Sequence, residues 1–247
     1  MSIDKFESDI LRIFEKAVSI YGSNIRGKLS RLSDKLINLH RANRVKINHS
    51  VMEMILGAYL IDRGYEVDVE ADVGDNLVAD VTAYNGEEKM IVEIETGFTS
   101  PENALDPQSY LTARIISKLA RYSKYADLFS FATPLHNVLQ IPRFYLKTIR
   151  ERSLKEALIL RDLCSRYYSQ PPITIEDLRN SRIDSIYLLN IDTLEVRRLT
   201  PKKYVETLIE RFTPKTLELK KYLKWSQHSE QAGTSCTQPY NSQAVYP

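Results

Sequence analysis

The sequence predicts an α/β fold in which helices flank a short mixed central sheet, with a helical extension at the N-terminus. Apolar residues recur at helical spacing in residues 3–21 and 51–61. Three segments have the length and composition of strands: residues 66–73, 77–84 and 90–96. Asn85-Gly86 between the last two is typical of a hairpin turn. With 247 residues and 43% hydrophobic content, the chain can bury a core of this kind.

Further elements are expected on either side of these strands. Gly22 can act as the C-cap of the first helix, and residues 51–61 are apolar nearly all round, which indicates a buried helix. Asp106 and Pro107 can supply the N-cap and first-turn proline of another helix. The other expected elements are helices at about 28–41, 106–125, 143–168, 201–212 and 215–225, a strand at 128–132, and a hairpin of residues 185–192 and 195–199.

The chain is expected to form one α/β domain with appendages. We assign residues 1–48 to the N-terminal helical extension and residues 49–225 to the α/β domain, and we predict that the polar residues 226–247 are disordered. No apolar run approaches the roughly 18–20 residues of a membrane helix, and the acidic start does not resemble a secretory signal. Cys164 and Cys236 have no metal-ligand spacing. We therefore expect a cytoplasmic protein without membrane association.

The net charge of +2 conceals a segregation of charge along the chain. Residues 1–48 carry a net charge of +5, residues 49–99 of −10, and residues 100–247 of +7. An acidic block within basic surroundings suits a cation site in a protein that meets a polyanion, because Lys and Arg neutralise phosphates while carboxylates hold a metal. The alternative is an acidic sheet edge that only faces solvent.

Three carboxylates with apolar neighbours mark the strands of the first hairpin: Asp80, Glu93 and Glu95. Glu93 and Glu95 point to the same face because side chains alternate along a strand, and they lie roughly 7 Å apart. A loop of Asn85-Gly86 alone makes Glu93 the diagonal neighbour of Asp80, whereas a loop of residues 85–88 sets the two directly opposite. Either even-length loop gathers all three carboxylates on one face, and an odd-length loop separates them.

Like charges gathered this closely repel one another unless one is protonated or a cation lies between them. A divalent cation with oxygen ligands resolves the conflict. Glu53 is a fourth candidate, since it is the only charged residue of the apolar segment 51–61 and a buried carboxylate usually has a partner. The alternative for Glu53 is a cap, a pair with Lys or Arg, or exposure to solvent.

This order of parts resembles the core of the PD-(D/E)xK nucleases, which include restriction enzymes and archaeal Holliday-junction resolvases. Small nucleases of archaeal viruses are similar in layout. The resemblance covers about residues 49–133 and rests on a helix with Glu53, a strand with Asp80, a hairpin, and a strand with Glu93-Ile94-Glu95. It implies a restriction-endonuclease-like core and a DNA endonuclease that depends on Mg²⁺ or Mn²⁺. The implied catalytic residues are Glu53, Asp80, Glu93 and Glu95, of which Asp80, Glu93 and Glu95 would ligate the metal.

One position departs from the family pattern. The usual lysine, two residues after the glutamate, is Glu95 in this chain. Some restriction enzymes of the superfamily have this Glu-x-Glu form and are active, and others carry the lysine on a neighbouring element. Lys118 or Lys89 could serve in that way. A glutamate cannot donate positive charge to the phosphate, so Glu95 would shift the mechanism towards greater dependence on metal ions.

DNA contacts are expected from basic helices, above all the one that follows the catalytic strand. Arg114, Lys118 and Arg121 are spaced four and three apart, which puts them on one helical face. The alternative is an ordinary solvated face. His49 is expected near the start of the Glu53 helix without a special role. No Gly-rich phosphate loop is present, so no nucleotide cofactor is indicated.

The leading interpretation is therefore a metal-dependent DNA endonuclease with branched or junction DNA among its substrates. A catalytically inactive nuclease-fold protein that binds DNA is the first alternative, and an α/β interaction protein with a fortuitous acidic strand is the second. The partner is expected to be DNA, and the sequence leaves a homodimer open. If the chain is viral, its compartment would be the host cytoplasm.

Overall fold

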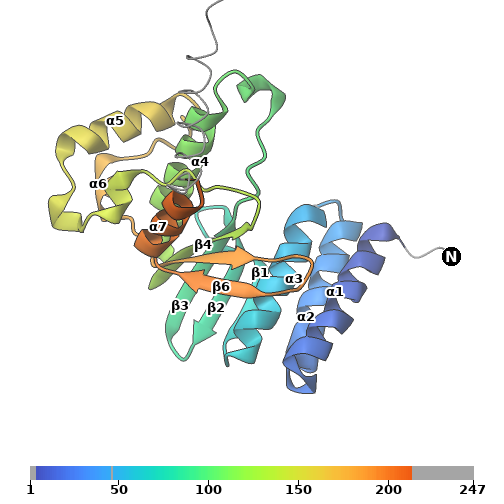
Figure 1. Cartoon of the computed structure of the whole chain (residues 1–247). Coiled ribbons are helices and arrows are strands. Elements are labelled where there is room, and N and C mark those ends of the chain that lie inside the picture. Colours follow the sequence, from blue (N-terminus) through green and yellow to red (C-terminus); the bar gives the residue numbers. More distant parts are fainter. Residues whose placement is uncertain (1–3, 46, 213–247) are drawn as a thin grey trace, which may run out of the picture. The chain divides into compact units, whose positions relative to one another are not determined.

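The computed structural model describes residues 4–45 and 47–212 of the chain, and its strands form one six-stranded sheet in the order β1-β2-β3-β4-β5-β6 (Figure 1). The strands are β1 (Glu66–Gly74), β2 (Leu77–Asn85), β3 (Glu88–Ile94), β4 (Leu128–Pro134), β5 (Ser185–Leu189) and β6 (Val196–Leu199). Strands β1 to β3 form an antiparallel meander, β4 and β5 run parallel to β3, and β6 is antiparallel to β5. The sheet is therefore mixed, as predicted.

Helices supply the rest of the fold. The α-helices are α1 (Lys5–Tyr21), α2 (Arg26–Arg41), α3 (Ile47–Asp62), α4 (Pro107–Tyr122), α5 (Leu154–Ser165), α6 (Ile175–Asn180) and α7 (Pro201–Phe212). Short 3-10 turns lie at Ser23–Ile25, Pro101–Asn103, Ser123–Tyr125, Arg143–Leu146 and Ile149–Glu151. The described residues up to Tyr204 form one compact unit, and those from Val205 onward are assigned to a second, so the border between the units falls within α7.

One apolar core joins the first three helices to a face of the sheet. It contains Ile10 of α1, Leu29 of α2, Leu56 of α3 and, from β3, Val92 and Ile94. Because side chains alternate along a strand, the intervening Glu93 of β3 points to the opposite face. That face meets α4, which contacts α5 and α6 and forms the crossover between the parallel strands β3 and β4. The predicted α/β class, with helices flanking a short sheet and an N-terminal helical region, is confirmed.

The first hairpin has the register of the longer predicted loop. Tyr84 pairs with Lys89 and Asn85 with Glu88, so the turn is centred on Gly86 and Glu87 rather than on Asn85-Gly86. Gly86 has a φ of 62°, the left-handed conformation that glycine adopts without strain. The last backbone pair in this register is Val81 with Val92, and Asp80 and Glu93 are the next residues along the two strands.

Most helix boundaries agree with the sequence analysis, and one helix was predicted wrongly. Asp106 is the N-cap of α4, accepts a hydrogen bond from the Ser109 amide, and precedes a proline in the first turn, as expected. The long helix predicted at 143–168 is instead two 3-10 turns followed by α5. Thr148 and Ser153 each open a capping box with the glutamate three residues later, and both adopt extended backbone there. These two local starts interrupt a continuous helix.

The short helix α6 was not predicted. Its signal is again a capping box, between Thr174 and Asp177. The second hairpin, β5 with β6, agrees with the prediction. The predicted helix at 215–225 and the predicted disordered tail at 226–247 lie outside the described residues. No helix within the described residues is long and apolar enough to cross a membrane.

Candidate active site

The backbone pairing of β2 with β3 ends just before the two predicted carboxylates. After the Val81–Val92 pair, the amide of Asp80 donates to Oε1 of Glu93 (3.3 Å) and the amide of Ile94 donates to Oδ2 of Asp80 (2.6 Å). Side-chain carboxylates thus replace backbone carbonyls as acceptors between the strands. We call this point the fork, and residues of both α3 and α4 reach Asp80 there.

Lys118 of α4 joins the three predicted strand carboxylates. Its Nζ lies 2.8 Å from Oε2 of Glu93, 2.7 Å from Oε1 of Glu95 and 3.7 Å from Oδ2 of Asp80. Nζ also donates to the carbonyl oxygen of Ile94 at 3.4 Å. Asp80, Glu93 and Glu95 therefore lie close together, as expected, and the ammonium group of Lys118 lies among them.

Glu95 has a second cationic partner. Nε of Arg114, one helical turn before Lys118, lies 2.9 Å from Oε2 of Glu95 and 3.0 Å from Oε1. Only 3% of the Glu95 side chain is exposed. The Glu95 backbone carbonyl accepts from Oγ1 of Thr133 (2.8 Å) and Nδ2 of Asn137 (3.0 Å). Both carboxylate oxygens of Glu95 are therefore engaged, and its backbone is held from β4 and the loop that follows.

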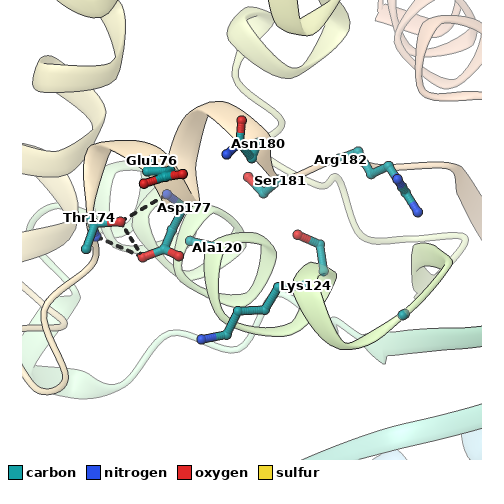
Figure 2. A pocket seen from close by; sticks show the side chains of 10 residues that line it. Ala120, Lys124, Thr174, Glu176, Asp177, Asn180, Ser181 and Arg182 are labelled. Carbon is teal, nitrogen blue, oxygen red and sulfur yellow. Dashed lines mark hydrogen bonds between the residues drawn. The ribbon is translucent and has the colours of Figure 1, made fainter.

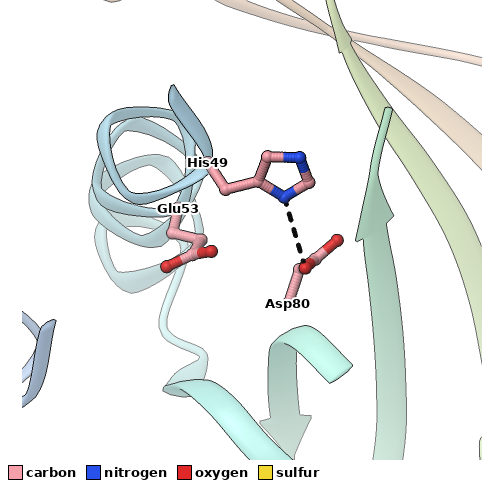
Figure 3. Close-up of side chains that lie close together, drawn as sticks. All are labelled: His49, Glu53 and Asp80. Carbon is pink, nitrogen blue, oxygen red and sulfur yellow. Dashed lines mark ion pairs between the residues drawn. The ribbon is translucent and has the colours of Figure 1, made fainter. Parts of the chain in front are cut away.

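On the other side of the fork, α3 presents His49 and Glu53 towards Asp80 (Figure 3). Nδ1 of His49 lies 3.5 Å from Oδ1 of Asp80. Glu53 is completely buried, and neither carboxylate oxygen has a hydrogen-bond partner among the described residues. Donor atoms of His49, Glu53 and Asp80 lie within 4.8 Å of one another, which is close enough for all three to hold one metal ion.

The buried carboxyl groups differ strongly in their affinity for protons. Burial raises the pKa of Glu53 well above its usual value, and the charges of Asp80, Glu70 and Glu93 add to that rise. Burial and then Asp80 raise the pKa of Glu93 to about 8, against the opposing effect of Lys118. Burial also acts on Asp80, but Lys118 and then His49 hold the pKa of Asp80 below its usual value. The pKa of Asp80 is thus held low, whereas the pKa values of Glu53 and Glu93 are raised.

The nearby carboxylates raise the pKa of Lys118 and so keep its ammonium group protonated. Burial alone would lower the pKa of its ammonium group, but Glu93, Asp80 and Glu95 raise that pKa well above the usual value. The site therefore holds a permanent positive charge next to the fork. Lys89, the other lysine considered from the sequence, lies four residues before Glu93 at the hairpin end of β3, about 13 Å away along the strand.

The three residues predicted to contact DNA all make contacts within the protein. Arg114 and Lys118 face the carboxylates, with 21% and 17% of their side chains exposed. Nη2 of Arg121 donates to the backbone carbonyls of Gln170 (3.3 Å) and Pro171 (3.1 Å). A DNA contact by any of the three stays a prediction.

His49 is the residue of this site that the sequence analysis left without a role. A signal was present: His49 and Glu53 are four residues apart, which puts them on one face of a helix. Without the fold, however, nothing linked that face to Asp80. The spacing of His49 and Glu53 indicates a shared site only once α3 is known to lie beside Asp80 of β2.

Two hollows on the described surface differ in their relation to this site. One, of about 430 Å³, lies between the end of α4 and the capping box of α6, and none of the predicted site residues lines it (Figure 2). The other, of about 520 Å³, is lined by Val51 and Met52 of α3 and by Thr96 and Phe98 after β3. Its lining includes direct chain neighbours of Glu53 and Glu95, but neither glutamate lines it.

Comparisons with known proteins do not identify the site. No protein-family model and no curated protein matches the chain. A solved structure with some similarity is that of the SPO1766 protein of unknown function from Silicibacter pomeroyi, at 12% sequence identity and a TM-score of 0.30. That match covers 71% of this chain and 88% of the other. At this TM-score the similarity carries no argument about fold or function.

Proposed function

We propose that this protein is a metal-dependent nuclease that hydrolyses phosphodiester bonds in DNA, with Asp80 at the centre of its active site. The observation that carries the proposal is the convergence of Asp80, Glu93 and Lys118 at the fork between β2 and β3, beside the buried Glu53, which has no hydrogen-bond partner in the described part of the chain. Carboxylates and a lysine in this combination agree with the PD-(D/E)xK resemblance found in the sequence.

The residues around Asp80 fit a divalent cation. Glu53 supplies two buried oxygens that no residue of segments 4–45 and 47–212 contacts by a hydrogen bond, and leaving such a group unsatisfied costs about 1–3 kcal/mol. Carboxylate oxygens suit Mg²⁺ and Mn²⁺, and the His49 nitrogen is a donor more usual for transition-metal ions than for Mg²⁺. Asp80, Glu53 and His49 would hold the ion, with Glu93 beside them. When bound, the ion would supply Lewis-acid stabilisation of phosphate charge and a water of lowered pKa.

Lys118 takes the role that the family assigns to the lysine missing at position 95. Its ammonium group lies between Glu93 and Glu95, is protonated, and can hold a scissile phosphate oxygen or orient the attacking water by donating a hydrogen bond. Glu93 has a raised pKa, so its free carboxylate is basic enough to accept a proton from that water at Oε1 or Oε2.

Glu95 acts as a positioning residue in this scheme. Its Oε1 contacts Lys118 and both of its oxygens contact Arg114, so Glu95 fixes where the Lys118 ammonium group lies. The family resemblance implied that Glu95 is itself a metal ligand, and that role requires these ion pairs to break. The two roles predict different effects of mutation on metal affinity.

The substrate class follows from charge. The acidic segment 49–99 is flanked on both sides by segments of net positive charge, which suits a polyanionic substrate. Branched or junction DNA is one substrate form that the family resemblance suggests. We propose a cytoplasmic location because the two cysteines, with no metal-ligand spacing, suit a reducing compartment.

A catalytically inactive DNA-binding protein is the second candidate, and one observation favours it. Lys118 and Arg114 already neutralise Glu93 and Glu95 without any metal, so part of the cluster is satisfied as a buried ion-pair network. Such a network can be purely structural.

Cleavage assays separate the two candidates. Purified protein is incubated with supercoiled plasmid, linear duplex and a four-way junction in Mg²⁺, Mn²⁺, Ca²⁺ or EDTA. The proposal predicts cleavage in Mg²⁺ or Mn²⁺, none in EDTA, and loss of cleavage with retained DNA binding in Asp80→Asn. Glu87→Gln, at the exposed turn of the same hairpin, is the matched control and should cleave normally. DNA binding without cleavage in any ion would establish the second candidate instead.

A further inference from the structure

Helix α5 carries apolar side chains on the face that points away from the protein. Ala157 and Cys164 are buried on its inner side, where α5 contacts α4 and α6 (Figure 1). On its outer side, 56% of Leu154, 37% of Leu158 and 59% of Ile159 are exposed. No described residue covers these three large aliphatic side chains, which lie within six positions of one helix.

Several charges of α5 and its flanks are arranged symmetrically about the midpoint between Leu158 and Ile159. Three pairs of residues at equal distances from that midpoint carry opposite charges: Lys155 with Asp162, Glu156 with Arg161, and Glu151 with Arg166. Within one chain, Asp162 also pairs with the neighbouring Arg161 at 2.9 Å. A helix turns by about 100° per residue, so Lys155 and Asp162 lie along the middle of the exposed face, with Leu158 on one side of that line and Ile159 on the other.

We propose that α5 pairs antiparallel with α5 of a second copy of this chain, about a two-fold axis at the Leu158–Ile159 midpoint. Such an isologous contact brings each residue against the one at equal distance beyond the axis. Lys155 then lies beside Asp162 of the partner subunit, and this pair forms twice. Leu158 and Ile159 lie at the two edges of this contact, where each meets the same residue of the partner subunit, and the contact shields both side chains from water.

The same charges disfavour a parallel pairing of the two α5 helices. In a parallel pairing, Lys155 of one copy would lie against Lys155 of the partner subunit, and like charges placed directly opposite one another repel. The inference concerns residues outside the carboxylate cluster and does not depend on the proposed nuclease activity. A contact built mainly on one helix buries less than the roughly 1,200 Å² of a standard interface, so the dimer dissociates in the micromolar range.

Sedimentation equilibrium of the full chain tests the pairing at about 1–300 µM in low salt, a range chosen for a small interface. The wild type should dimerise, and raising the salt concentration should weaken the dimer. Lys155→Asp or Asp162→Lys alone sets like charges opposite each other at both ends of the contact, and should weaken dimerisation at least tenfold. The double variant Lys155→Asp/Asp162→Lys restores opposite charges and should return to near the wild-type affinity.

Controls separate this result from damage to the fold. Lys155 and Asp162 are exposed, so circular dichroism of every variant should match the wild type. Lys5→Asp, a charge reversal at an 86% exposed lysine of α1, should leave dimerisation unchanged. A wild type that stays monomeric throughout the range would overturn the inference, whether α5 is bare or covered by another part of its own chain. Single variants that dimerise normally, or a double variant that does not recover, would also overturn it.

Discussion

Replacing Glu53 with methionine tests whether this buried carboxyl group belongs to a cation site. Methionine has a similar length and shape but no polar atom, so it fills the same space in α3. Because both Glu53 oxygens lack partners among the described residues, the substitution removes an unsatisfied group that costs about 1–3 kcal/mol. For a protein of this size, 1 kcal/mol shifts Tm by roughly 2–4 °C. In EDTA, we therefore expect Glu53→Met to raise Tm by about 2–12 °C.

The gain should depend on pH, with a sign set by the raised pKa of Glu53. A carboxyl group whose pKa is higher in the folded state stabilises the fold below its unfolded pKa, and this contribution is lost as pH rises through the folded pKa. Wild-type stability thus falls with rising pH at this group, whereas methionine does not titrate. The Tm difference between Glu53→Met and the wild type should be larger at pH 8 than at pH 5.

Divalent ions should reverse the order of stability. An ion that binds the folded state at 100 times its Kd adds about 2.7 kcal/mol to the stability of the wild type. Glu53→Met lacks one of the ligands and should show little or no rise in Tm with Mg²⁺ or Mn²⁺. Thermal unfolding followed by circular dichroism, in EDTA and across an ion titration, measures both effects.

Glu95→Met is the matched control, because Glu95 is equally buried but fully paired. Removing its carboxylate leaves Lys118 and Arg114 without that partner, and breaking a buried ion pair in this way costs about 3–5 kcal/mol. Its Tm should fall in EDTA, opposite to Glu53→Met. A lower Tm for Glu53→Met in EDTA, or an unchanged response of that variant to ions, would refute the assignment of Glu53 to a cation site.

Three further substitutions test the roles proposed around the fork. Lys118→Ala should lower the cleavage rate in single-turnover kinetics by about 100-fold or more, with little change in DNA affinity measured by filter binding. Weaker DNA binding with a smaller salt dependence would instead show that Lys118 is a phosphate contact. Glu95→Gln should lower kcat while leaving KM and the half-saturating Mg²⁺ concentration unchanged, and a clear rise in that Mg²⁺ concentration would show that Glu95 is a ligand. His49→Ala should raise the half-saturating Mn²⁺ concentration more than that of Mg²⁺, and equal responses to both ions would contradict a role for its nitrogen as ligand.

Local patterns in the sequence were sufficient for the class of fold and for the gathering of the strand carboxylates. Alternation along a strand puts Glu93 and Glu95 on one face, and any even-length hairpin loop adds Asp80 to it, so the uncertain turn did not matter. Asp106-Pro107 likewise predicted the start of α4 from its own chemistry. The single helix predicted at residues 143–168 was wrong because the capping boxes at Thr148 and Ser153, both present in the sequence, each start a new helical segment.

The partners of those carboxylates were decided by tertiary structure. Lys118 and Arg114 occupy one face of α4, and their spacing alone suits DNA as well as it suits Glu93 and Glu95. Lys118 and Arg114 contact Glu93 and Glu95 because the crossover between β3 and β4 packs α4 on the Glu93 face of the sheet. His49 and Glu53 similarly share a face of α3, and the packing of α3 against the sheet is what brings that face to Asp80. Spacing along one helix or strand determines which of its side chains share a face. Contacts between distant segments depend on how whole helices and strands pack, and the periodicity within one segment does not predict that packing.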